Sequence, residues 1–193
     1  MPLNSGEFSY LCAAQKDDAE TTSWRWLALG RATMASLTID VPNLEGTMAL
    51  GRRLAQHLFP GAVIALVGPL GAGKTHFVRA VAEGLEIADS RVVNSPTFVL
   101  IQEYRARLPL YHFDAYRLRT PAEFSDLGAH EYFAGDGVCL VEWADRVESC
   151  LPAEYLRITI TPTGETSRRF DLEAFGGRYE RVLAALQEAP DKL

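Results

Sequence analysis

A glycine-rich turn between a buried strand and a helix places the strongest constraint on how this chain can fold. Residues 68–75 read Gly-Pro-Leu-Gly-Ala-Gly-Lys-Thr, which matches the pattern Gly-x-x-x-x-Gly-Lys-Ser/Thr. The preceding aliphatic run, Ala62–Val67, is typical of a strand that is buried on both faces of a parallel sheet. The following segment, Lys74–Leu85, predicts a helix. The sequence therefore predicts a phosphate-binding loop at a strand–helix junction.

Each residue type in this loop suits phosphate binding. Glycines let the backbone curl so that successive N–H groups point at phosphate oxygens, and the helix start adds the positive end of its dipole. Lys74 can reach the β- and γ-phosphates as a point charge, and the Thr75 hydroxyl can bind Mg²⁺. The chain has no Asn-Lys-x-Asp guanine-reading motif, which favours adenine. The nucleotide-binding residues predicted from the loop are Gly68, Leu70, Gly71, Ala72, Gly73, Lys74 and Thr75.

The rest of the chain predicts a single α/β domain over residues 35–193, with a mixed sheet flanked by helices and antiparallel hairpins at its margins. The expected strands are Ser36–Val41, Ala62–Val67, Val99–Tyr104, Leu110–Tyr116, Gly137–Trp143, Tyr155–Thr161 and Arg168–Ala174. The expected helices are Leu44–Phe59, Lys74–Leu85, one or two short helices within Pro121–Phe133, and Arg178–Glu188. Residues 1–34 show no sustained periodicity, and we expect a poorly ordered N-terminal extension there.

Two carboxylates are candidates for the metal side of the site. Glu142 ends a buried strand where phosphate-loop proteins usually place an Asp near Mg²⁺, although it could instead be a surface residue at a strand end. Strand alternation predicts that Asp114 shares one face with His112 and Tyr116, which suits a metal or water-orienting site and equally a half-buried strand. We expect Trp143 to pack rather than to take part in chemistry.

A hydroxyl group could complete the site from the segment between the loop helix and the Asp114 strand. Thr97, in Ser95-Pro96-Thr97, lies where nucleotide switches supply a hydroxyl toward the γ-phosphate. The spacing alone is a weak basis for this role.

Composition excludes some classes of function. The formal net charge is −6, so the total does not indicate the basic face of an autonomous nucleic-acid binder. No apolar stretch approaches the roughly 18–20 residues of a membrane span, and we expect no membrane partner. The chain has 3 cysteines without a CxxC pair, which fits a reducing compartment, and we expect a cytoplasmic location.

Several motifs, in their order along the chain, resemble the bacterial tRNA threonylcarbamoyladenosine biosynthesis ATPase family, TsaE (YjeE). They are Gly68–Thr75 (GPLGAGKT), Ser95–Tyr104 (SPTFVLIQEY), Tyr111–Leu118 (YHFDAYRL), Glu123–Phe133 (EFSDLGAHEYF) and Val138–Trp143 (VCLVEW). Walker-type loops alone are common, whereas this combination is specific. The resemblance covers the chain from about Met34 to its end, the C-terminal hairpin and helix matching only in pattern.

The resemblance implies a small Mg²⁺-dependent ATPase that supports formation of N6-threonylcarbamoyladenosine (t6A) at position 37 of tRNA. It implies a TsaD-type transferase and a TsaB-type protein as partners, with tRNA contacted through that complex and weak activity in isolation. It also implies that Thr75, Asp114 and Glu142 lie at the metal, and that Thr97 is the switch hydroxyl. The resemblance further places Leu44 and Thr47 near the adenine. The catalytic set that follows is Lys74, Thr97, Asp114 and Glu142.

Two departures from the family pattern are visible. Ala144 follows Glu142-Trp143 where relatives usually have Pro, and the segment before Met34 has no counterpart in a typical member. Two other functions stay open: a small-molecule kinase that uses the same loop, and a nucleotide-sensing module that never hydrolyses ATP.

Overall fold

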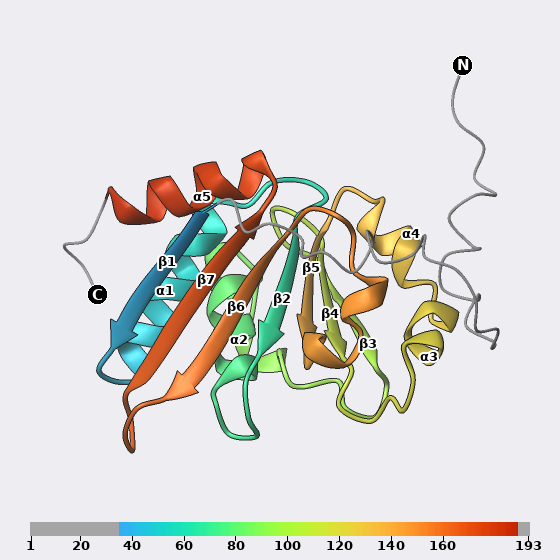
Figure 1. Ribbon diagram of the computed structural model, residues 1–193, viewed down its shortest axis with the longest axis horizontal. Helices are drawn as coiled ribbons and strands as arrows, with labels where there is room; N and C mark the ends of the chain where they lie inside the picture. The colour runs from blue at the N-terminus through green and yellow to red at the C-terminus, as the bar shows by residue number, and fades with distance from the viewer. Residues whose placement is uncertain (1–34, 189–193) are drawn as a thin grey trace, which may run out of the picture.

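The computed structural model describes residues 35–188, which form an α/β domain around one seven-stranded sheet (Figure 1). The strand order is β1-β7-β6-β2-β5-β4-β3. Strands β6, β2, β5 and β4 run parallel, whereas β3, β7 and β1 join antiparallel at the two sides. This confirms the predicted fold class, a mixed sheet flanked by helices with antiparallel hairpins at the margins.

The helices and strands occur in the predicted order, and most of their bounds lie close to the predicted ones. The strands are β1 (Ala35–Val41), β2 (Val63–Val67), β3 (Ile101–Tyr104), β4 (Leu110–Asp114), β5 (Val138–Glu142), β6 (Tyr155–Pro162) and β7 (Arg168–Phe175). The α-helices are α1 (Leu44–His57), α2 (Lys74–Gly84), α3 (Pro121–Asp126), α4 (Ala129–Phe133) and α5 (Gly177–Gln187). Short 3-10 turns cover Ser90–Val92, Ala144–Arg146 and Glu148–Cys150. Residues 1–34, for which we expected a poorly ordered extension, lie outside the described part of the chain.

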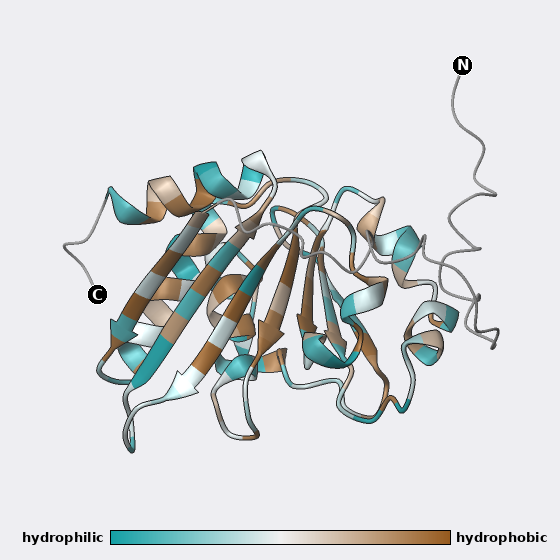
Figure 2. Ribbon diagram, viewed as in Figure 1, coloured by the Kyte–Doolittle hydropathy of each residue, from teal (hydrophilic) through white to brown (hydrophobic). Residues whose placement is uncertain are grey.

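Hydrophobic patterning explains the two kinds of strand. The central strands β2 and β5 are almost uniformly apolar because helices or turns cover both of their faces (Figure 2). Strands β6, β7 and β1 alternate between more and less buried residues, since one of their faces is covered better than the other. One core lies between the sheet and α1, α2 and α5, and a second lies under α3, α4 and the 3-10 turns.

The predicted strand around Asp114 is shorter than expected. The sequence pattern extended it to Tyr116, but β4 ends at Asp114. Asp114 Oδ1 accepts a hydrogen bond from the backbone N–H of Tyr116 at 2.8 Å, which turns the chain out of the sheet. Tyr116 therefore lies beyond the strand, and the expectation that it shares a strand face with Asp114 was wrong.

The parallel strands place their carboxyl ends at one edge of the sheet. Asp114 and Glu142 are register partners at the ends of β4 and β5, and β2 lies next to β5 and ends beside them. The turn from β2 into α2 leaves the sheet at this edge (Figure 1). The fold thus brings both candidate carboxylates to the predicted phosphate loop.

None of the helices within residues 35–188 has the length and apolar character that a bilayer crossing requires.

Helices α1 and α2 cross at a small residue, and this crossing yields a stability prediction. A Cβ atom at Gly51 would lie 2.4 Å from the Ala80 Cβ and 3.2 Å from the Phe77 carbonyl oxygen. We therefore expect Gly51→Ala to lower the free energy of unfolding by about 1–3 kcal/mol, because overpacking forces the helices apart. Urea unfolding measures this. Gly177→Ala is the control because a Cβ there meets nothing within 4 Å, and equal midpoints for the two variants would contradict the prediction.

Candidate functional site

The predicted phosphate loop connects β2 to α2 and has the backbone shape that its glycines require. Gly68, Gly71 and Gly73 have φ angles of 148°, 77° and 106°, a region that side chains disfavour. Gly68 also lies under the end of β6, where an added Cβ would come within 2.5 Å of the Ile160 carbonyl oxygen. The glycines are thus needed for both the curvature and the close packing of the loop.

The Lys74 side chain folds back over this loop. Its Nζ donates hydrogen bonds to the carbonyl oxygens of Gly68 at 2.7 Å and Pro69 at 3.0 Å. The same ammonium lies 3.7 Å from the centre of the Trp143 ring. Burial lowers the pKa of Lys74 from its ordinary value, while the charges of Glu142 and Asp114 act in the opposite direction. A buried cation is therefore held at the position where a polyphosphate would enter.

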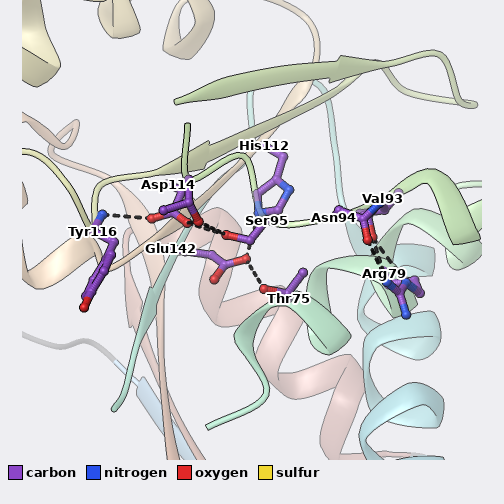
Figure 3. Close-up of polar contacts among 10 residues, drawn as sticks. Thr75, Arg79, Val93, Asn94, Ser95, His112, Asp114, Tyr116 and Glu142 are labelled. Carbon is purple, nitrogen blue, oxygen red and sulfur yellow. Dashed lines mark hydrogen bonds and ion pairs between the residues drawn. The ribbon is translucent and has the colours of Figure 1, made fainter. Parts of the chain in front are cut away.

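Glu142 connects the loop helix to the sheet. Its Oε1 accepts a hydrogen bond from the Thr75 hydroxyl at 2.8 Å and lies 2.9 Å from the Nε2 of His112 (Figure 3). Glu142 is 3% exposed and His112 is fully buried, so the structure rules out the alternative of a surface glutamate. The Nδ1 of His112 is buried and has no hydrogen-bond partner among residues 35–188. Because Oε1 makes both contacts, the other carboxylate oxygen of Glu142 is the one left for a ligand.

Asp114 accepts hydrogen bonds from two hydroxyl groups of the segment before β3. Its Oδ2 accepts a hydrogen bond from the Ser95 hydroxyl (Figure 3) and another, at 2.8 Å, from the Thr97 hydroxyl. Arg79 of α2 anchors the start of this segment, donating from Nη2 to the Val93 carbonyl oxygen at 2.9 Å. The structure thus places Thr97 beside a carboxylate at the edge of the site, and its role as a switch hydroxyl stays a prediction.

These groups surround one cavity of about 460 Å³ beside the loop. Its lining residues are Leu70, Gly71, Ala72, Gly73, Lys74, Thr75, His76, Ser95, Thr97, Asp114, Tyr116, Glu142 and Trp143. Three predicted residues are not part of the lining. Gly68 begins the loop beneath β6, Leu44 is 51% exposed at the start of α1, and Thr47 is buried one turn later. The placement of the adenine near Leu44 and Thr47 stays a prediction.

The donor set fits Mg²⁺ only if a phosphate ligand completes it. Thr75, Glu142 and Asp114 offer one hydroxyl and two carboxylate groups at the cavity, which are hard oxygen ligands. Within residues 35–188 no group of three or more His, Cys, Asp or Glu side chains could hold a metal alone. Mg²⁺ is usually bound by one or two carboxylates together with substrate phosphates, and this arrangement has that form.

Sequence reasoning missed several residues that the fold adds to the site. Ser95 and His112 were noted within motifs but not assigned to the site, although both contact its carboxylates. Trp143 was expected to pack, yet its ring lines the cavity and lies under the Lys74 ammonium. Its φ angle of 60° turns the chain sharply after β5 and directs the ring back toward the loop. The alternation in β4 pointed to His112, and Ser95 adjoins Thr97 in the sequence. The placement of Trp143 had no local indication.

Comparisons with known proteins agree with one another. Residues 41–170 match the family model described as "Threonylcarbamoyl adenosine biosynthesis protein TsaE". A protein of Bacillus subtilis (strain 168) is 49% identical over 154 residues, which is 79% of this chain and 95% of the relative. A Treponema pallidum (strain Nichols) protein is 41% identical over 126 residues, covering 65% of this chain and 92% of the relative. Both are named tRNA threonylcarbamoyladenosine biosynthesis protein TsaE.

The fold is also similar to a solved structure. The crystal structure of Bacillus subtilis YdiB superimposes with a TM-score of 0.70 at 42% sequence identity, and covers 80% of this chain and 95% of that one. The family match spans the loop, Asp114 and Glu142, so the residues of the cavity fall inside the shared region.

Proposed function

The chain belongs to the TsaE family of tRNA threonylcarbamoyladenosine biosynthesis proteins, and from that premise we propose that it binds and hydrolyses Mg²⁺-ATP as an accessory protein for t6A formation at tRNA position 37. Its partners in this proposal are a TsaD-type transferase and a TsaB-type protein, which contact the tRNA. The observation that supports the proposal best is the cavity that joins Lys74, Thr75, Asp114 and Glu142 beside a phosphate-loop backbone.

The chemistry of the proposed reaction rests on positioning and electrostatics. The loop amides and Lys74 hold the β- and γ-phosphates, and the buried ammonium offsets charge on the transferring group. Thr75 and the free oxygen of Glu142 are the residues that would hold Mg²⁺, while His112 and the Thr75 hydroxyl fix the Glu142 carboxylate. A Mg²⁺ ion held by these residues would supply positive charge that offsets the charge of the phosphates.

Asp114 and the two hydroxyls next to it have a second proposed role. The Ser95 and Thr97 hydroxyls lie on one oxygen of this carboxylate, at the cavity wall. An attacking water held there would be oriented by an acceptor and by two groups that can donate or accept. Asp114 therefore orients the attacking water in the proposed mechanism.

The surface around the cavity supports a protein partner. Leu70 is 79% exposed and Tyr116 is 40% exposed at the cavity, and Phe98 and Val99, which follow Thr97, are 84% and 65% exposed. Exposed apolar side chains gathered in one place are typical of contact sites. A partner that covers them would also exclude water from the site, which would raise the hydrolysis rate.

The test is phosphate release from ATP by the purified chain, alone and with the TsaB–TsaD-type pair of the same organism. We expect weak release that rises at least about fivefold with the pair, because docking completes the site. Phe98→Ser should reduce this stimulation, whereas Val92→Ser, at a residue that is 50% exposed but does not adjoin the switch threonine, should not. A rate that is indifferent to the pair would contradict the proposal, and transfer of phosphate to a metabolite would favour a kinase.

A further inference from the structure

Arg168, at the start of β7, makes an unusual set of contacts with the phosphate loop. Its Nε donates a hydrogen bond to the Ala72 carbonyl oxygen at 2.9 Å, and its Nη2 lies 3.5 Å from the Gly71 carbonyl oxygen. Its Nη1 donates to the Ser167 carbonyl oxygen at 2.8 Å and to that of Gly164 at 3.2 Å. One guanidinium therefore joins the turn between β6 and β7 to Gly71 and Ala72 of the phosphate loop, although 96 residues separate Arg168 from Ala72.

The contact with Ala72 fixes more than a carbonyl group. The described peptide bonds are all trans, and in a trans peptide the C=O and the N–H of one unit point in opposite directions. A hydrogen bond that holds the Ala72 carbonyl toward Arg168 therefore directs the Gly73 N–H away from it. Gly73 is the N-cap of α2, and amides at this position are those that bind phosphate.

The turn that supplies Arg168 is itself tied down at two further points. The backbone N–H of Thr163 donates to the Ser167 carbonyl oxygen at 3.1 Å, which closes the turn. The Thr166 hydroxyl donates to the Pro42 carbonyl oxygen at 3.1 Å, just before α1. Figure 1 shows this turn and the loop after β2 at the same edge of the sheet. These hydrogen bonds fix the backbone of residues 163–167, and therefore the position from which the Arg168 side chain reaches the loop.

Arg168 and its neighbour Arg169 have different kinds of partner. Arg169 pairs with Asp40, its Nε lying 2.9 Å from Oδ1, on the open face of the sheet. Within residues 35–188, no carboxylate forms an ion pair with Arg168, and the partners of its guanidinium are backbone carbonyl oxygens. Its positive charge therefore stays available to the loop.

We propose that Arg168 is a positioning residue that orients the Gly71–Gly73 peptides for phosphate binding and links nucleotide binding to the β6–β7 turn. This inference rests on the proposed function, because it requires that the loop bind a nucleotide. Its physical basis is preorganisation: a loop already held in its binding conformation loses less conformational entropy when the phosphates arrive. A molecule that contacts the β6–β7 turn at the sheet edge would then change nucleotide affinity, because the turn carries Arg168.

The test measures Mg²⁺-ADP and Mg²⁺-ATP affinity by calorimetry for the full chain and three variants. We expect Arg168→Ala to weaken both affinities about tenfold, since charge-assisted hydrogen bonds that orient the loop are lost. Arg168→Lys should fall between, because one ammonium cannot reproduce the contacts of a guanidinium. Arg169→Ala is the matched control, and its affinities should stay within about twofold of wild type.

Hydrogen exchange of the wild-type chain gives a second readout that a merely structural role would not move. Mg²⁺-ADP should slow amide exchange in residues 163–167 together with residues 70–73, and Arg168→Lys should weaken the response of the turn. This measurement decides the question even if Arg168→Ala fails to fold. Equal affinities for Arg168→Ala and Arg169→Ala, or a turn that does not respond to nucleotide, would overturn the inference. A wild-type chain that binds no nucleotide would instead overturn the proposed function itself.

Discussion

Replacing Lys74 with alanine should lower partner-stimulated ATP hydrolysis by about a hundredfold or more, because it removes the buried cation next to the transferring phosphate. Lys74 is 4% exposed, and its Nζ is held by the Gly68 and Pro69 carbonyl oxygens at the loop. A charge in such a low-dielectric position acts more strongly on a phosphate than the same charge at the surface. Phosphate release by the complex is the measurement.

The same substitution also changes the balance of charge within the cavity. Lys74 is the cation that faces Glu142 and Asp114, and both carboxylates favour its charged form. Without Lys74, the two carboxylates would repel the phosphates with less compensation, so ATP affinity should fall together with the rate. The fold should survive, because alanine is a good helix former at the start of α2.

A matched control removes a cation that lies away from the cavity. Arg91 is exposed and pairs with Asp89, at a distance of 2.8 Å between Nε and Oδ1. Arg91→Ala should hydrolyse ATP within about twofold of wild type, because an exposed pair of this kind contributes little. If Lys74→Ala kept more than half of the wild-type rate, the assignment of the loop to phosphate chemistry would be wrong.

Local sequence patterns were enough to predict most of the fold. The uniformly apolar β2 and β5 could be recognised as doubly covered strands, and the glycine-rich loop marked the junction between β2 and α2. Boundaries failed where a local hydrogen bond, from a side chain or from the backbone, competes with the sheet. The predicted strand from Val99 begins instead at Ile101, because the Leu100 N–H donates to the Pro96 carbonyl oxygen and Leu100 adopts a φ of 67°. Such local competition with the sheet is not visible in hydrophobic periodicity.

The site was predictable to the extent that it follows from strand ends and motifs. The sequence indicated a strand end at Glu142, whereas the predicted Asp114 strand ran on to Tyr116. The two carboxylates become neighbours because β4 and β5 pair in parallel with Asp114 opposite Glu142. Arg168 and Trp143 could not be found in this way. The contact between Arg168 and Ala72 depends on how the β6–β7 turn folds over the loop, and the Trp143 position depends on a left-handed backbone residue. Both are consequences of tertiary packing between segments that are far apart in the chain.

The Glu142→Gln variant should separate the binding of the metal from the binding of the nucleotide. The amide oxygen of glutamine can keep the hydrogen bonds that Thr75 and His112 make to Oε1, so the shape of the site is preserved. The negative charge is lost, together with the carboxylate oxygen left for Mg²⁺. We expect the rate to fall about a hundredfold and half-saturation by Mg²⁺ to rise about tenfold, because a carboxylate is a far better ligand for this hard cation than an amide.

The affinity for nucleotide in the absence of metal shows whether Glu142→Gln impairs metal binding alone or nucleotide binding as well. In the presence of a chelator, ADP should bind Glu142→Gln as tightly as wild type or more tightly, since a carboxylate that repels phosphate is gone. Glu148→Gln is the control, because that residue is half exposed and pairs with Arg157 away from the cavity. Superimposable Mg²⁺ titrations of Glu142→Gln and wild type would show that the metal is held elsewhere. Asp114, at the end of the neighbouring strand, would then be the carboxylate to replace next, because it is the other acidic side chain that lines the cavity.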